Sequence, residues 1–314
     1  NLFKNTLGMQ GIEVRFADPA DPKNFEKLTD EKTRAYYGES CPNPYLRVFP
    51  IKEVADIGRK HGIPLIIDNT ASPVICKPLE HGAAVVMHSL TKYIGGHGTS
   101  IGGIIIDGGN FDWTANPKRQ PLFNEEDPSY KGAVWGRDVP KLTGANVAFA
   151  VRSRVVLLRD LGAPLAPFNA FQIIQGLETV ALRMKQHCMN AEKVVTFLET
   201  QKKVKNVIYP TNHQGEIKDR AKRYMKGGYG SLVGMDVGTR EAGSKFIDNL
   251  KMLYHVANIG DARSLAIHPA TTTHSQLNDE ELLAAGVTPG YVRLSIGIEH
   301  PDDIIGDIKQ ALAA

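Results

Sequence analysis

The stretch Pro64-Leu-Ile-Ile-Asp-Asn-Thr70 contains a run of three large apolar residues that ends in an acid. A continuous apolar run of this length is typical of a parallel β-strand that is buried on both faces. Residues 83–87 and 103–106 repeat the pattern, while residues 50–61 begin with proline and carry apolar side chains at helical spacing. Strands that alternate with helices predict βαβ units and a mostly parallel sheet.

The second half of the chain has a different pattern, in which long helical segments come first and shorter strands follow. We expect helices over residues 147–161, 169–186, 190–201, 241–250 and 301–314. Strands are expected over residues 12–16, 33–37, 231–237, 254–257 and 291–296. An α/β unit is therefore followed by an α+β unit, and we predict two domains, 1–186 and 187–314.

The beginning of the chain is expected to lie inside an element of secondary structure. Residues 1–7 have the pattern of the last turns of an amphipathic helix, and Gly8 stands where a helix commonly ends. We therefore expect a further N-terminal part of the protein to precede Asn1 and to contribute to the fold.

Composition and charge exclude several classes of protein. The 314 residues carry 37 basic and 34 acidic side chains, a net charge of +3 that is too small for an electrostatic footprint on nucleic acid or an anionic membrane. No apolar run approaches the roughly 18 residues that a membrane span needs. Three cysteines without a C-x-x-C pair argue against a disulfide scaffold or a zinc–thiolate site and favour the cytoplasm. No metal site is expected, because the histidines lack the spacing of metal ligands.

Two groups of polar side chains follow neighbouring strands. Asp68 ends the strand over residues 64–68, and residues 88–92, His-Ser-Leu-Thr-Lys, follow the strand over residues 83–87. In parallel sheets, ligands lie beyond the carboxyl ends of the strands. Hydroxyls suit a phosphate, a lysine of lowered pKa can form a Schiff base, and a carboxylate can pair with a pyridinium nitrogen. Together these groups match what pyridoxal phosphate (PLP) chemistry requires.

A plainer interpretation is that Asp68 caps a turn and that Lys92 is a solvated cation. The glycines after Lys92 argue against it, because residues 95–103 contain five of them, where the backbone must approach another group closely. A dinucleotide-binding loop is a second alternative. The glycines at 96, 98 and 102 miss its G-x-G-x-x-G spacing and precede a strand rather than a helix, which argues against a nicotinamide-dependent dehydrogenase.

These motifs resemble those of a known family. Residues 68–70, Asp-Asn-Thr, and residues 88–97 resemble the signature of the PLP-dependent enzymes of cysteine and methionine metabolism. The likeness extends over nearly the whole chain, at residues 39–44, 175–179, 183–188, 268–274 and 293–299. Within the family, the O-acetylhomoserine sulfhydrylases are most similar, at residues 98–103, 111–139 and 260–265. The resemblance implies fold type I of the PLP-dependent transferases (aminotransferase-like), an α/β fold with a mostly parallel large-domain sheet and a smaller α+β C-terminal domain.

The resemblance also implies a role for each of the polar residues. Lys92 is implied to form the Schiff base and to move protons between substrate carbons. The other implied cofactor contacts are Asp68 at the pyridine nitrogen, Ser89 and Thr91 at the phosphate, and Asn43 at the 3′-oxygen. The implied substrate contacts are Arg293 as a two-pronged clamp on the α-carboxylate, with Ser264 and Asn43 beside it. An arginine inside the apolar strand over residues 291–296 needs an anionic partner in any case, and a structural carboxylate is the alternative.

The function that the resemblance implies is γ-replacement. O-acetyl-L-homoserine loses acetate and accepts sulfide, or a small thiol such as methanethiol, to give L-homocysteine or methionine. The alternative within the family is a γ-lyase or γ-synthase, such as methionine γ-lyase, cystathionine γ-synthase or O-succinylhomoserine sulfhydrylase. These enzymes share the cofactor residues, and only the long segment 111–139 favours the sulfhydrylase. A catalytically inactive structural subunit is a further alternative, against which Asp68, Lys92 and Arg293 argue.

The resemblance further implies a homotetramer of paired dimers, in which the N-terminal arm of the partner subunit completes each site. That arm, and a tyrosine that stacks on the cofactor ring, would precede Asn1. The sequence itself favours a large interface, because residues 111–139 are polar overall but rich in large apolar side chains. We expect these side chains to be exposed: Phe111, Trp113, Leu122, Phe123, Tyr130 and Trp135.

Overall fold

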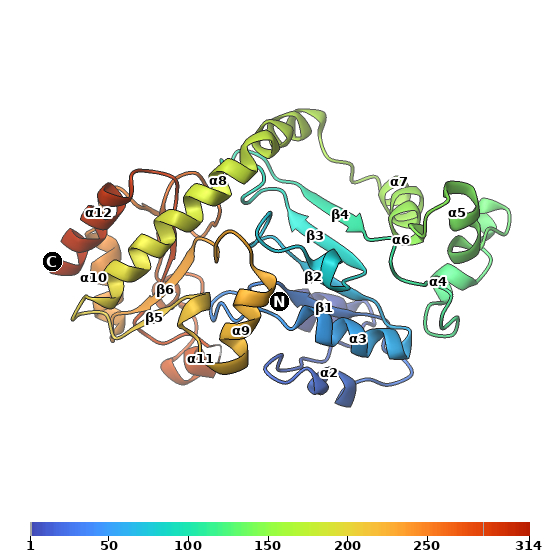
Figure 1. The fold of residues 1–314 in the computed structure, drawn as a ribbon, viewed down its shortest axis with the longest axis horizontal. Coiled ribbons are helices and arrows are strands. Elements are labelled where there is room, and N and C mark those ends of the chain that lie inside the picture. The colour runs from blue at the N-terminus through green and yellow to red at the C-terminus, as the bar shows by residue number, and fades with distance from the viewer. Residues whose placement is uncertain (1, 285) are drawn as a thin grey trace.

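Residues 2–284 and 286–314 are described by a computed structural model, which contains two β-sheets (Figure 1). The first sheet has the strand order β1 (Tyr36–Glu39), β2 (Leu65–Asp68), β3 (Val85–Ser89) and β4 (Gly103–Asp107). Its first three strands are parallel, and β4 is antiparallel to β3. The second sheet is mixed, with the strand order β5 (Asn206–Ile208), β6 (Leu232–Asp236), β9 (Tyr291–Ser295), β8 (Leu265–Ile267) and β7 (Tyr254–His255). The predicted α/β class with a mostly parallel first sheet is confirmed.

Helices connect and cover these strands. The α-helices of the first half are α1 (Leu7–Met9), α2 (Lys23–Lys27), α3 (Ile51–His61), α4 (Pro121–Asn124), α5 (Trp135–Thr143), α6 (Ala148–Arg152) and α7 (Arg159–Leu161). Those that follow are α8 (Pro167–Glu199), α9 (Gly215–Tyr224), α10 (Arg240–Asp248), α11 (Asp279–Ala284) and α12 (Pro301–Ala313). Figure 1 shows α4 to α7 at one end of the molecule and α10 and α12 at the other. In the described part of the chain, no helix combines the length and the hydropathy that a membrane span requires.

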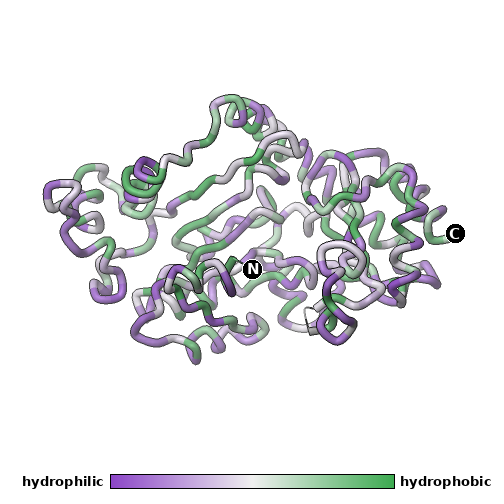
Figure 2. The backbone as a smooth tube through the Cα atoms, turned by 180° about the vertical axis from the view of Figure 1, so that it is seen from behind, coloured by the Kyte–Doolittle hydropathy of each residue, from purple (hydrophilic) through white to green (hydrophobic). Residues whose placement is uncertain are grey.

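Helix α3 packs on one face of the first sheet. It begins after Pro50 and ends at Gly62, whose left-handed φ of 66° is a conformation that glycine adopts without strain. The core between this helix and the sheet includes Tyr36, Ile51, Val54, Leu65, Ile67 and Val86. Figure 2 shows hydrophobic stretches in the middle of this sheet, where β2, β3 and β4 carry their apolar runs. Because side chains alternate along a strand, Tyr37 and Asp68 belong to the opposite face.

Helix α8 is one continuous helix of 33 residues where the sequence pattern predicts two. The predicted break falls at residues 187–189, His-Cys-Met, which contain neither glycine nor proline, so nothing there ends a helix. The C-terminal half of α8 contributes Ala191, Val194 and Leu198 to the core of the second sheet. The predicted domain boundary after residue 186 lies inside this helix. We propose that the two units, 1–186 and 187–314, share α8.

The aromatic side chains of residues 111–139 are mostly buried, so the prediction that they are exposed is wrong for four of the six. Phe111, Trp113, Phe123 and Trp135 are each less than 8% exposed and form a small core of their own against the first sheet. The ring centroids of Trp113 and Phe123 lie 4.3 Å apart. Tyr130 is half-buried and Leu122 is exposed. The many aromatic side chains of this segment therefore pack against one another, and their number does not indicate an interface.

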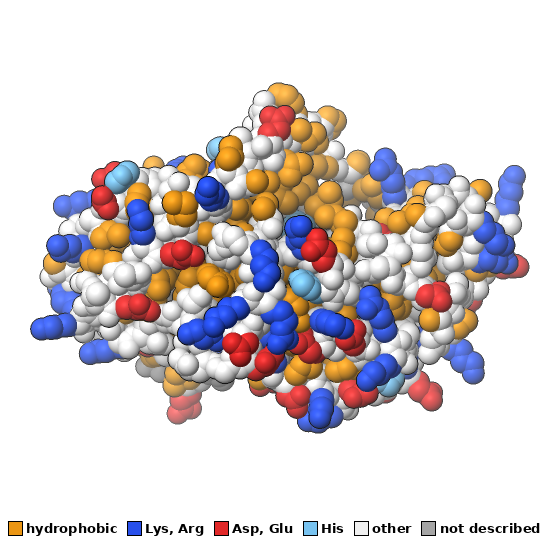
Figure 3. All heavy atoms as spheres, viewed as in Figure 1, with side chains coloured by type: hydrophobic (Ala, Val, Ile, Leu, Met, Phe, Trp, Pro, Cys, Tyr) orange, Lys and Arg blue, Asp and Glu red, His pale blue; other side chains and the backbone are white. Residues whose placement is uncertain are grey.

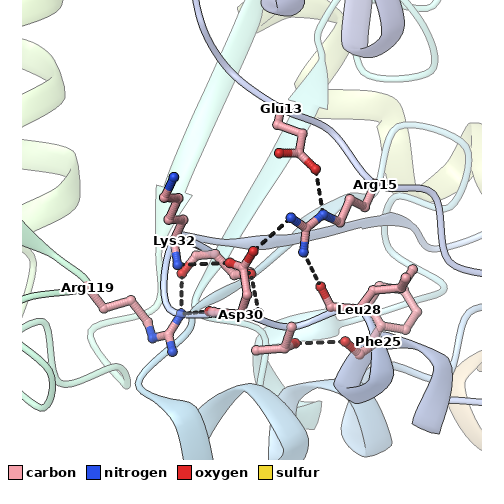
Figure 4. A network of polar contacts seen from close by, with 9 residues as sticks. Glu13, Arg15, Phe25, Leu28, Asp30, Lys32 and Arg119 are labelled. Carbon is pink, nitrogen blue, oxygen red and sulfur yellow. Dashed lines mark hydrogen bonds and ion pairs between the residues drawn. The ribbon is translucent and has the colours of Figure 1, made fainter.

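The segment over residues 12–16, predicted as a strand, pairs with no other strand. Arg15 fixes it instead: Nε donates a hydrogen bond to Glu13 at 2.6 Å, one terminal nitrogen donates to the Leu28 carbonyl at 3.0 Å, and the other lies 2.7 Å from Asp30 (Figure 4). An alternating pattern predicts a strand only where a neighbouring strand can pair with it. The helical turns before this segment extend over Leu2–Thr6 and Leu7–Met9, past Gly8, and Asn1 lies outside the described residues.

Candidate active site

The strand ends bring the predicted cofactor residues to one edge of the first sheet. Asp68 is the last residue of β2 and pairs in register with Met87 of β3, two residues before Ser89 ends that strand. Asn43 follows the end of the neighbouring strand β1 and is exposed. The edge beyond parallel strands is where ligands bind in α/β sheets, and the geometry here matches that rule.

Asp68 accepts hydrogen bonds at both carboxylate oxygens. Oδ1 accepts from the backbone N–H of Thr70 at 2.8 Å, and Oδ2 accepts from the hydroxyl of Tyr37 at 3.3 Å. Burial and the Asp68 charge raise the pKa of Tyr37, so the phenol stays a donor. Burial and the same charge also raise the pKa of the Glu39 carboxyl. No lysine or arginine of the described residues forms an ion pair with Asp68, which leaves this half-buried carboxylate available to a cationic group of a ligand.

A tight turn leads from the end of β3 to Lys92. The backbone N–H of Ser89 donates to Oγ1 of Thr70 at 2.8 Å, which joins this turn to the end of β2, and the N–H of Lys92 donates to the Ser89 carbonyl at 3.2 Å. Oγ1 of Thr91 accepts from the Gly102 N–H at 3.1 Å and donates a long hydrogen bond to the Gly102 carbonyl at 3.4 Å. Both hydroxyl residues are half-buried at the same edge as Asp68. Hydroxyls and backbone N–H groups of this kind suit the oxygens of a phosphate.

Lys92 and Arg293 lie on either side of Asn258. Nζ of Lys92 donates a hydrogen bond to the side-chain oxygen of Asn258, and a terminal nitrogen of Arg293 donates to the Asn258 carbonyl at 3.1 Å. Burial, and after it the charge of Arg293, lower the pKa of Lys92. Burial also lowers the pKa of Arg293, whose Nε is buried without a hydrogen-bond partner. The structural carboxylate that was the alternative for Arg293 is absent from the described residues around it, so an anionic ligand fits this position.

Ser264 is the predicted site residue whose geometry fits its role least. Its hydroxyl donates to Glu299 at 2.9 Å and accepts from the backbone N–H of Gly297 at 2.8 Å, and the side chain is fully buried. The N–H of Ser264 also donates to Glu299, at 2.6 Å. The one hydroxyl hydrogen of Ser264 is thus already donated to a carboxylate, which leaves none for a substrate carboxylate. Ser264 instead fixes the segment that follows β9.

Two residues at this site were not predicted from the sequence. Asn258 lies in the loop between β7 and β8, away from any strand end, so no positional rule points to it. Tyr37 was assigned only as the end of a strand. The register of β1 with β2, in which Tyr37 pairs with Ile66 and Glu39 with Asp68, could have placed Tyr37 on the Asp68 face.

The cysteines lie outside the chemistry of this site. Cys41, Cys76 and Cys188 are free and buried. Burial raises the pKa of Cys76 to about 12 and that of Cys188 to about 11, so neither supplies a thiolate at neutral pH. Within residues 2–284 and 286–314, no group of three or more His, Cys, Asp or Glu side chains is placed to hold a metal ion.

The donor set fits PLP. A carboxylate without a cationic partner suits a protonated ring nitrogen, and hydroxyls at the same edge suit the phosphate. An amine of lowered pKa suits an aldehyde carbon. The unpartnered Nε of Arg293 beside that amine suits the carboxylate of an amino acid. The side chains that supply these groups are Asp68, Ser89, Thr91, Lys92 and Arg293.

Comparison with known proteins gives the same cofactor. A family model described as Cys/Met metabolism PLP-dependent enzyme matches residues 1–313. A solved structure from Campylobacter jejuni, assigned as an O-acetylhomoserine (thiol)-lyase and containing a lysine that carries pyridoxyl 5′-monophosphate, has a TM-score of 0.91 with this chain. The two are 40% identical, and the match covers 100% of this chain and 74% of that one.

Relatives with assigned activities are similar over nearly the whole chain. The O-acetyl-L-homoserine sulfhydrylase of Leptospira meyeri is 50% identical over 99% of this chain and 72% of its own length. The homocysteine synthase of Schizosaccharomyces pombe is 44% identical over 99% of this chain and 72% of its own length.

Proposed function

Because the chain belongs to the family of PLP-dependent enzymes of Cys/Met metabolism, we propose that it makes L-homocysteine from O-acetyl-L-homoserine and sulfide. The bond between the γ-carbon and the acetate oxygen breaks, and a bond between the γ-carbon and sulfur forms. The proton that hydrogen sulfide loses leaves with acetate, so the reaction needs no oxidant or reductant. With methanethiol as the acceptor, the same replacement gives methionine. The chain is thus a PLP-dependent transferase with the type I fold of its relatives.

The observation that carries this proposal is the placement of a lysine of lowered pKa next to a half-buried arginine whose Nε has no hydrogen-bond partner. The arginine would bind the α-carboxylate of the amino acid in two-pronged fashion. That contact would present the α-carbon to Nζ of Lys92. An unprotonated amine at this position can take a proton from one substrate carbon and return it to another.

When bound, PLP withdraws electrons from the substrate carbons through its protonated pyridine ring. Asp68 would hold the proton on the ring nitrogen, because its carboxylate has no other cationic partner among the described residues. Tyr37 and Thr70 orient that carboxylate by the hydrogen bonds they donate to it. Ser89 and Thr91 would bind the phosphate, and Asn43, exposed at the same edge, would contact the ring oxygen and the substrate. Ser264 would hold the segment after β9 in place through its hydrogen bonds with Glu299 and Gly297.

Substrate competition with the full-length enzyme tests the proposed activity. O-acetyl-L-homoserine with sulfide should give L-homocysteine with the highest kcat/KM, and the Lys92→Ala variant should give none. O-succinyl-L-homoserine with sulfide, O-acetyl-L-homoserine with L-cysteine, and L-methionine alone test the three alternatives. The proposed activity would be wrong if kcat/KM were higher for the succinyl ester, for cystathionine formation, or for release of 2-oxobutyrate from methionine. The reaction with the highest value would then be the activity of the enzyme.

We further propose that the protein is a cytoplasmic homo-oligomer, a tetramer of paired dimers. Its three cysteines are free and buried, which suits a reducing compartment. The N-terminal half of α8 carries the large exposed side chains Phe168, Phe171, Ile174 and Leu177. An apolar face of this kind is typical of an interface between subunits.

A further inference from the structure

Helix α8 contains an arginine that is buried without a counter-charge. Arg183 is only 6% exposed, and no carboxylate of the described residues lies within ion-pair distance of it. Burial lowers its pKa. Removing a guanidinium from water costs free energy unless hydrogen bonds replace those to solvent. The hydrogen-bond partners of this side chain therefore indicate why it is buried.

The guanidinium binds the turn that carries Lys92. One terminal nitrogen donates to the Tyr93 carbonyl at 2.6 Å, and the other donates to the Ile94 carbonyl at 2.9 Å and to the Gly176 carbonyl at 2.7 Å. Nε donates to the hydroxyl of Thr179 at 3.1 Å. Tyr93 and Ile94 are the two residues directly after Lys92. A rigid, planar fork thus fixes the backbone from which the Lys92 side chain extends.

The turn and the helix are in close contact around this arginine. A Cβ atom added at Gly176 would lie 2.6 Å from the Ile94 carbonyl oxygen, so only glycine allows the helix this close. On the opposite side, the N–H of Ala262 donates to the Gly96 carbonyl at 2.8 Å. The turn is therefore held between α8 and the loop that also contains Asn258.

The same face of α8 binds the end of the strand that carries Arg293. His187 lies one helical turn after Arg183, and its Nδ1 donates to the Ile296 carbonyl at 2.6 Å. Burial lowers the pKa of His187 to about 4, so the ring is neutral. Asn190 donates to the Gly297 carbonyl at 3.0 Å. One helix therefore contacts both the Lys92 turn and the strand end beyond Arg293.

We propose that Arg183 is a positioning residue, which sets where the amine of Lys92 lies relative to Arg293 by binding the two carbonyls that follow the lysine. This inference rests on the proposed function only in that Lys92 is taken as the lysine that bonds to the cofactor. All the hydrogen bonds that the Arg183 guanidinium makes go to groups of the protein itself. Its loss should therefore act on the reactivity of Lys92 and leave the chemistry of the other groups unchanged.

The test compares Arg183→Lys with the matched variant Arg220→Lys. Arg220 is also buried, at 4% exposure, and donates to two carbonyls, of Pro19 and Ala20, both at 2.9 Å. It differs in having an ion pair, with Glu216 at 3.6 Å, and neither this pair nor its hydrogen bonds involve α8 or the turn. Lysine keeps the charge at both positions but cannot reproduce the fork. Thermal unfolding of both variants measures the loss of stability that follows from replacing a buried arginine at either position.

The deciding readout is the rate at which apoprotein incorporates PLP at Lys92, measured by borohydride quenching at timed intervals and peptide mass spectrometry. We expect Arg183→Lys to slow this incorporation about 10- to 100-fold, the usual cost of a small misplacement of a reacting group, and Arg220→Lys to leave it unchanged. The kcat per PLP-loaded subunit should fall in Arg183→Lys, with a smaller change in KM.

Thr179→Val provides a milder variant, because it removes only the hydroxyl that accepts from Nε and preserves side-chain shape. It should slow incorporation in the same direction by a smaller factor. If Arg183→Lys and Thr179→Val incorporate PLP at the wild-type rate, or if Arg220→Lys slows it equally, Arg183 is a structural residue and the proposal is wrong. Label on a different lysine in the wild type would instead contradict the proposed function.

Discussion

Two cationic side chains, Lys92 and Arg293, share the neutral residue Asn258 as a hydrogen-bond partner. Burial and the Arg293 charge lower the pKa of Lys92. A lower pKa increases the fraction of unprotonated amine at neutral pH, and only that form attacks a carbonyl carbon or accepts a proton. The neutrality of Asn258 matters, because a carboxylate in its place would favour the charged amine.

Asn258→Asp is therefore expected to raise the pKa of Lys92. The new carboxylate would accept the hydrogen bond from Nζ and stabilise the ammonium, so the pH midpoint for PLP incorporation at Lys92 should move up by about one pH unit or more. The measurement is the incorporation rate of the apoprotein as a function of pH, followed by visible absorbance. Asn258→Ser, which keeps the position neutral, should leave the midpoint near that of the wild type. A midpoint that moves down in Asn258→Asp, or equally in both variants, would contradict this account of the amine.

Some residues of the site could be predicted from the sequence and others could not, for a physical reason. Asp68 and Lys92 follow buried strands, and the carboxyl ends of parallel strands meet at one edge, so their proximity follows from the pattern alone. Asn258 comes from a loop whose path depends on tertiary packing, and no periodicity locates it. Nothing in the local sequence around Ser264 indicates that Glu299 accepts a hydrogen bond from its hydroxyl.

At the scale of elements, α8 determines how the two sheets meet at the site. Its predicted interruption is absent, and its length lets one helix contact the Lys92 turn and the end of β9. The longer strands and α3 were predicted from periodicity. The three-residue strands β5 and β8 were not, because such short segments carry too little periodicity to be distinguished from loops.

Gly176→Ala should disturb this contact. The added methyl would lie 2.6 Å from the Ile94 carbonyl oxygen and closer still to that of Gly95, so the helix or the turn must shift. Overpacking of this kind costs about 1–3 kcal/mol of unfolding free energy, measurable by urea titration. Gly306→Ala in α12 is the matched control, because nothing lies within 4 Å of its added methyl. It should stabilise the protein by about 0.5–1 kcal/mol. Equal effects of the two substitutions would show that α8 does not approach the turn this closely.

At the scale of the whole molecule, large apolar side chains remain uncovered along the N-terminal half of α8. Figure 3 shows hydrophobic side chains gathered where this part of α8 forms the top of the molecule. Phe168 and Phe171 are 67% and 55% exposed, and their ring centroids lie 6.4 Å apart. The aromatic segment 111–139, by contrast, covers most of its own side chains. We therefore propose that the subunits meet at this apolar surface of α8.

Phe171→Glu should weaken the assembly, because a charge at an apolar interface must be desolvated without a partner. Sedimentation of the full-length protein should give a tetramer for the wild type and a smaller species for this variant at the same concentration. Leu142→Glu adds the same charge at an 85% exposed leucine of α5, at the far end of the molecule, and should leave the mass unchanged. A monomeric wild type, or a tetramer that Phe171→Glu leaves intact, would contradict the placement of the interface on α8.

We expect the cofactor to be attached to Lys92, and locating the covalent attachment tests this. The full-length enzyme loaded with PLP is reduced with borohydride and digested, and its peptides are analysed by mass spectrometry. We predict a phosphopyridoxyl group on the peptide that contains Lys92, and its absence throughout the chain in Lys92→Ala. A phosphopyridoxyl group on any other lysine of the wild type, or on none, would contradict it.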